Sequence, residues 1–208
     1  MELHTWVLFC TAVILLTASP GPNMLLTLTA SVNHGLSRAM WCIIGSNVGF
    51  ILLMSISLAG LGALLATSEA VFGVFRICGA CYLLYLGLKL WRQEGGTLSD
   101  GAGKICAQAT PVRLFMRGFS VAMSNPKVIL FFAAFFPQFI DPSAPRMPQV
   151  FIMGATFVVC EFGMQVVFGV CAGSVRKFLA SPRRNKVFNR VSGGVFMAAG
   201  ALVATAER

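Results

Sequence analysis

Ser19-Pro20-Gly21-Pro22-Asn23 interrupts an apolar run that extends over residues 5–31. A helix needs about 20 mostly apolar residues to cross the hydrocarbon core of a bilayer, and this run is long enough. Proline lacks a backbone N–H and clashes with the preceding helical turn, so the cluster frees carbonyl groups inside the run. The pattern therefore predicts a membrane-spanning helix that is broken near its middle.

The composition extends this prediction to the whole chain of 208 residues. Apolar residues make up 57% and charged residues 11%, whereas soluble domains carry roughly 25% charged residues. Lipid-exposed irregular backbone would lack hydrogen-bond partners, so long apolar runs are expected to be helices. The runs cover residues 5–31, 39–66, 70–90, 117–140, 148–174 and 190–206. We predict an all-α polytopic membrane protein, one domain with six transmembrane helices.

Basic side chains concentrate in two segments between these runs. They cover residues 89–117 and 176–190, whereas 67–69 has no basic residue and 141–147 has only Arg146. Cytoplasmic loops carry an excess of Lys and Arg, so both basic segments are expected in the cytoplasm and both termini outside. The second segment is also basic enough to bind anionic lipid. The net charge of +9 then needs no nucleic acid partner.

The two halves of the chain resemble each other. Ser124-Asn125-Pro126-Lys127 breaks the fourth run as residues 19–23 break the first, and the openings at 76–83 and 190–197 share one residue pattern. Each half has an odd number of predicted spans, so the halves face opposite ways. We predict two inverted three-helix repeats with proline-broken first and fourth helices. Repeat one covers about 1–91, a cytoplasmic linker about 92–112, and repeat two about 113–208.

This plan is typical of secondary transporters, which bind substrate near the midplane at paired broken helices. Freed carbonyls suit an ammonium group and exposed N–H groups suit a carboxylate, so a zwitterionic amino acid would use both. The alternative is that the prolines only kink the helices, which neighbouring helices accommodate. The candidate site residues at the breaks are Pro20, Gly21, Pro22, Asn23, Asn125, Pro126 and Lys127.

Polar residues inside the runs are further candidates, because ionisable groups within a membrane are costly. Glu161 could titrate in a proton-coupled cycle or pair with a substrate ammonium; alternatively it pairs with Lys127 or bonds another helix. Lys127 could hold a substrate carboxylate or extend to the cytoplasmic interface. Asn47 could line the pathway or bridge helices, and the GxxxG formed by Gly45 and Gly49 predicts close helix packing.

These residues resemble the LysE/RhtB family of amino-acid exporters over nearly the whole chain. The resemblance rests on residues 19–23, 33–35, 79–87, 125–127, 136–140, 193–197 and 200–202. It implies efflux of amino acids across a bacterial inner membrane, driven by the proton gradient. The likeness is greatest to the homoserine, homoserine lactone and threonine branch. Asn47 stands in a region where the branch for basic amino acids tends to have an acid, which implies a neutral substrate.

Other classes of membrane protein fit the sequence less well. A thiol–disulfide electron carrier needs a reactive cysteine beside each break, and residues 19–24 and 124–128 contain none. A metal-ion exporter needs clustered ligands, whereas His4 and His34 stand alone. No nucleophile–base pair or phosphate loop indicates an enzyme, and no cofactor is expected. The expected partners are the amino-acid substrate and the bilayer, and the GxxxG permits a homo-oligomer.

Overall fold

The part of the chain that can be placed is helical throughout. A computed structural model describes residues 3–19, 21–65, 77, 80–81, 84–85, 87–89, 91–92, 110–141, 144–179 and 181–205. Its α-helices are α1 (Leu3–Ala18), α2 (Pro22–His34), α3 (Leu36–Leu65), α5 (Pro111–Met123), α6 (Pro126–Leu130), α7 (Arg146–Val170), α8 (Ala172–Leu179) and α9 (Pro182–Thr205). A π-helical turn, η1 (Phe131–Phe135), and a 3-10 turn, η2 (Phe136–Phe139), follow α6.

Long apolar helices make this an all-helical membrane protein. Two described segments are long and apolar enough to cross a bilayer, Leu36–Leu58 within α3 and the whole of α7. The pair α1 and α2 forms a third if the 54° bend between them is one broken span. The predicted run at 70–90 and the linker at 92–112 lie mostly outside the described residues. Six spans in two inverted repeats therefore stay a prediction.

The predicted boundary of the last helix differs from the structure. The apolar run begins at residue 190, but α9 begins at Pro182 and α8 covers Ala172–Leu179. Most of the segment predicted as a basic loop at 176–190 is therefore helical. Proline is favourable at the start of a helix, and polar residues propagate a helix outside lipid as well as apolar ones do. An apolar run therefore predicts the part of a helix that lies in lipid, and the helix itself can begin or end outside that run.

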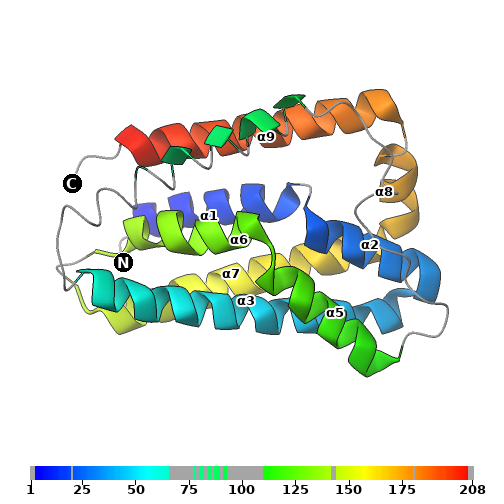
Figure 1. Ribbon diagram of the computed structural model, residues 1–208, viewed down its shortest axis with the longest axis horizontal. Coiled ribbons are helices and arrows are strands. Elements are labelled where there is room, and N and C mark those ends of the chain that lie inside the picture. The colour runs from blue at the N-terminus through cyan, green and yellow to red at the C-terminus, as the bar shows by residue number, and fades with distance from the viewer. Residues whose placement is uncertain are drawn as a thin grey trace.

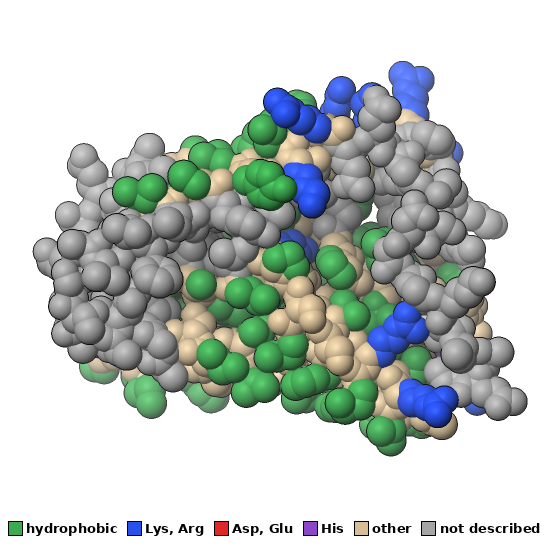
Figure 2. Space-filling model, viewed as in Figure 1, with side chains coloured by type: hydrophobic (Ala, Val, Ile, Leu, Met, Phe, Trp, Pro, Cys, Tyr) green, Lys and Arg blue, Asp and Glu red, His purple; other side chains and the backbone are tan. Residues whose placement is uncertain are grey.

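The breaks give the bundle its internal arrangement (Figure 1). The chain through α1 and α2 runs along the long axis in one direction, and the chain through α5 and α6 runs in the other. Figure 2 shows Lys and Arg side chains toward the end where α8 crosses the bundle. That end is called the basic end below; its exposed side chains include Arg38, Arg113, Arg183, Arg184 and Arg190. The ends of α1 and α9 that lie nearest the termini are at the opposite end of the bundle.

Glycines allow α3 and α5 to pack backbone against backbone. A Cβ atom on Gly45 would overlap the backbone of Phe115, and one on Gly118 would overlap the backbone of Cys42. A Cβ on Gly49 would lie 2.9 Å from the Cβ of Ala122. The predicted packing role of the GxxxG at Gly45 and Gly49 is confirmed.

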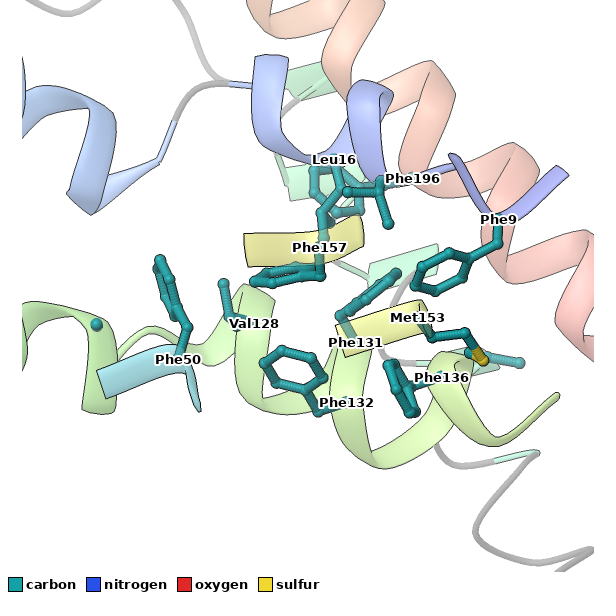
Figure 3. Close-up of a cluster of buried hydrophobic side chains, with 13 residues drawn as sticks. Phe9, Leu16, Phe50, Val128, Phe131, Phe132, Phe136, Met153, Phe157 and Phe196 are labelled. Carbon is teal, nitrogen blue, oxygen red and sulfur yellow. The ribbon is translucent and has the colours of Figure 1, made fainter. Parts of the chain in front are cut away.

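A cluster of buried aromatic rings lies among α1, α3, α7 and the turns η1 and η2 (Figure 3). From the second break, α6 runs toward these turns and away from the basic end (Figure 1). The ring of Phe132 lies 4.7 Å from that of Phe157, and the ring of Phe9 lies 5.3 Å from that of Phe139. Phe9 precedes the first break along α1, and Phe157 precedes Glu161 along α7. We call this group the Phe cluster; its rings are Phe9, Phe50, Phe131, Phe132, Phe136, Phe157 and Phe196.

Candidate functional site

The two breaks contact each other directly. Asn125 Nδ2 donates to Asn23 Oδ1 at 2.9 Å, and both side chains are buried although the residues stand 102 positions apart. Asn125 also caps α6, because its Oδ1 accepts from the backbone N–H of Lys127 at 3.2 Å. One asparagine therefore both starts the helix after the second break and binds the first break.

Lys127 places its ammonium group in the first break. Its Nζ donates to the carbonyl oxygens of Leu16 at 3.0 Å and Ser19 at 3.2 Å, and to Ser19 Oγ at 3.2 Å. In a continuous helix the Leu16 carbonyl would accept from residue 20, which is a proline without an N–H. A Cβ on Gly21 would lie 3.2 Å from Nζ, so glycine leaves the ammonium its space. The Leu16 carbonyl also accepts from the backbone N–H of Ser19 at 3.2 Å and from Ser19 Oγ at 2.7 Å, so Lys127 joins acceptors that the end of α1 already uses.

Buried hydrogen-bonding atoms without partners lie in this region. Asn23 Nδ2 has no partner, and neither has Asn47 Oδ1. Asn47 Nδ2 donates to the backbone carbonyl of Ile43, one turn back on α3, at 2.9 Å. Gly21 is the N-cap of α2 and supplies no side-chain hydrogen bond to the first turn. Because buried polar atoms are normally paired, these groups are available to a polar ligand.

Glu161 lies in a second polar group, between α7 and α2. Its Oε1 accepts from Gln165 Nε2 at 3.0 Å, and Gln165 Oε1 accepts from Thr27 Oγ1 at 3.0 Å. All three side chains are buried. Within the described residues no ion pair joins Glu161 to Lys127.

The structure brings together some of the predicted site residues and not others. Asn125 contacts both Asn23 and Lys127, and Lys127 lies against Gly21; we call these four residues the break cluster. Pro22 and Pro126 are the first residues of α2 and α6 and are exposed. Pro20 lies outside the described residues, and no hydrogen bond of Asn47 or Glu161 reaches the break cluster.

The sequence analysis did not single out Ser19, Thr27 or Gln165. A signal for two of them existed, because residues four apart share a helix face. Thr27 follows Asn23 by four positions, and Gln165 follows Glu161 by four positions. Polar residues at that interval in an apolar helix indicate a polar seam.

A comparison of the sequence with known families places this helical chain among transport proteins. The family model for LysE type translocators matches residues 14–207. This chain belongs to the LysE family. Its membership makes it a membrane transport protein of an efflux family, as the resemblance implied.

Relatives of this LysE-family protein match along its full length. A homoserine/homoserine lactone efflux protein of Salmonella typhimurium is 33% identical over 100% of this chain and 99% of the relative. A leucine efflux protein of Salmonella choleraesuis is 31% identical over 99% of this chain and 96% of the relative. An uncharacterized membrane protein of Vibrio cholerae is 28% identical over 100% of both chains. No solved structure matches the chain.

Proposed function

We propose that this LysE-family protein exports a small neutral amino acid or a close derivative, such as homoserine, homoserine lactone or threonine, across the inner membrane in a proton-coupled cycle. The observation that carries the proposal is the contact between the two breaks, where the Asn23–Asn125 bond joins both halves near the partly buried ammonium of Lys127. Transporters of this plan bind substrate where two broken helices meet. The two named relatives, a homoserine/homoserine lactone efflux protein and a leucine efflux protein, support an amino acid as substrate.

The break cluster suits a carboxylate. The first turn of α2 has no side-chain cap, and helix N-termini attract anions because their N–H groups are unpaired. Asn23 Nδ2 adds a buried donor without a partner. The ammonium of Lys127 supplies positive charge beside both. A substrate carboxylate is therefore expected next to Asn23 and Lys127.

Glu161 is the counterpart for the substrate ammonium. The freed carbonyls of Leu16 and Ser19 are taken by Lys127, so a substrate ammonium cannot share them while Lys127 stays in place. Glu161 is the acidic side chain within the described membrane helices and has a free carboxylate oxygen besides the one bonded to Gln165. An acid in a membrane is a natural proton carrier. Glu161 would therefore bind the substrate ammonium and the transported proton one after the other.

The side-chain end of the substrate is expected to be neutral. The described parts of α1, α2 and α3 contain no Asp or Glu, so no acid is available there to pair with a second substrate cation. Asn47 offers a buried oxygen without a partner on α3, which suits a hydroxyl or amide donor. The proposal keeps six spans, both termini outside, and alternating access around the two breaks.

A growth and accumulation assay tests the proposal. The chain is expressed in amino-acid-sensitive bacteria, and external accumulation is measured for neutral amino acids, basic amino acids and homoserine derivatives. Raised tolerance together with accumulation of a neutral compound is the expected result. Accumulation of basic amino acids alone would exclude a neutral substrate, and no effect despite proven membrane expression would refute amino-acid export.

A further inference from the structure

Thr27 uses its hydroxyl differently from most other hydroxyl residues on these helices. Thr11, Thr29, Ser55 and Thr156 each donate to the backbone carbonyl one turn back on their own helix. Thr27 instead donates across the interface to Gln165 on α7, and it is 1% exposed. The direction in which the Thr27 hydroxyl donates its proton therefore depends on whether Gln165 of α7 turns an acceptor toward it.

What Gln165 presents depends in turn on Glu161. A carboxamide has an acceptor end and a donor end, and both ends of Gln165 are in use. An ionised carboxylate can only accept hydrogen bonds. Glu161 therefore turns the Nε2 end of Gln165 toward itself and leaves Oε1 toward Thr27. The observed direction of both bonds is the one that an ionised Glu161 requires.

A proton on Glu161 would permit the opposite direction. The protonated carboxyl donates, so Gln165 can turn its oxygen toward Glu161 and its N–H toward Thr27. The Thr27 oxygen then accepts, and its proton is free to go to the backbone carbonyl one turn back, as in the other threonines. Back-bonding of this kind bends helices. The reversed chain would therefore act on α2, the helix that begins at the first break.

We propose that Thr27 and Gln165 are positioning residues that transmit the protonation state of Glu161 to α2 and so to Asn23 of the break cluster. This inference rests on the proposed proton-coupled export. Asn23 precedes Thr27 by one turn, and Ser31, one turn further along, has a buried hydroxyl without a partner. Unpaired buried groups on both sides of Thr27 indicate that α2 gains other partners in a second arrangement.

The charged surroundings of Glu161 are few. Lys127 is the cation that acts on it, and Cys160 is the neighbouring titratable residue on α7. The described parts of α1, α2 and α3 add cations or imidazoles only near helix ends, at His4, His34 and Arg38. α8, which packs on α2 and α7, carries Arg176 and Lys177. A Glu161→Gln background is therefore needed to separate an effect through Glu161 from one through these other groups.

The test uses the purified full chain in proteoliposomes, with homoserine, threonine and leucine as probes. Net efflux is measured against internal and external pH, and exchange is measured at equal pH on both sides. Thr27→Val removes the hydroxyl at nearly constant volume, Thr27→Ser restores it, and Thr29→Val is the matched control. We expect Thr27→Val to lower net efflux about tenfold, to reduce exchange less and to flatten the pH profile. Thr27→Ser and Thr29→Val should keep the unsubstituted profile.

A double variant separates signalling from packing. If Thr27 acts through Glu161, then adding Thr27→Val to Glu161→Gln should cause no further loss of net efflux. If the two residues act independently, the two losses should add. An unchanged pH profile in Thr27→Val, or full additivity, would overturn the inference while leaving export intact. If Thr27→Val fails to fold, Gln165→Met gives the same comparison. Absence of transport by the unsubstituted chain for every probe would instead count against the proposed function and, with it, the inference.

Discussion

Lys127 shows how one side chain can complete a broken helix. Its three donors match three oxygens of Leu16 and Ser19, so the charge is compensated by dipoles rather than by a carboxylate. Both interpretations offered by the sequence, substrate binding and extension to the interface, left this contact out. The position of the ammonium depends on the approach of segments 108 to 111 positions apart, which local patterns cannot specify.

Replacing Lys127 should therefore damage the site and the fold together. In Lys127→Met the Ser19 carbonyl loses its donor, which costs about 1–3 kcal/mol, whereas the Leu16 carbonyl keeps the N–H and hydroxyl of Ser19. We therefore expect lower thermal stability and at least tenfold slower efflux. Lys127→Arg should not restore transport, because Gly21 leaves little room for a planar guanidinium. Lys89 is exposed, so Lys89→Met is the control. Wild-type efflux in Lys127→Met would contradict a role at the break.

At the scale of elements, the breaks were predictable because proline and asparagine act locally. The sequence placed breaks at 19–23 and 124–127, and α1 ends at Ala18, α2 begins at Pro22 and α6 begins at Pro126. The polar seam of Thr27 and Gln165 was not predicted, because each residue alone is unremarkable in a helix. Only the packing of α2 on α7 pairs them.

The contact of α3 with α5 gives a prediction about a whole element. Gly118→Ala would press a methyl group into the backbone of Cys42, and overpacking of this kind costs about 1–3 kcal/mol. We expect a lower unfolding temperature in detergent and reduced transport. Gly163→Ala on α7 is the control, because its Cβ would meet nothing within 4 Å. Equal stability of the two variants would show that α3 and α5 can separate without cost.

At the scale of the whole molecule, the basic end predicts the orientation in the membrane. Arg146 begins α7, and Arg184 lies in the first turn of α9 at the basic end; both are exposed. We expect Arg184→Cys to react with a membrane-impermeant maleimide only in inverted vesicles, and Arg146→Cys only in intact spheroplasts, with the unsubstituted chain as background. If both variants reacted from the same side of the membrane, the chain between residues 146 and 184 would not cross the membrane an odd number of times.

Under this predicted orientation the Phe cluster lies on the outward side of the breaks, and we propose that it closes the bundle there. Phe132 is 1% exposed and its ring contacts those of Phe131, Phe136 and Phe157. An exporter that stays closed outside while Asn23 and Lys127 bind substrate must open this cluster to release it. Replacing one ring by a smaller side chain should weaken this closure. The loss of folding stability should be smaller than the roughly 3–5 kcal/mol that a Phe→Ala substitution costs in a core.

We therefore expect Phe132→Leu to let substrate equilibrate across proteoliposomes without a pH gradient, at a rate several times that of the unsubstituted chain. The measurement is the loss of preloaded labelled homoserine or leucine at equal pH on both sides. Phe151→Leu on α7 is the control, because that side chain is 78% exposed. A leak equal to that of the control would mean that the outward closure lies elsewhere and that the Phe cluster only packs the helices. A leak confined to Phe132→Leu would instead identify the aromatic rings as the barrier that the transport cycle must open.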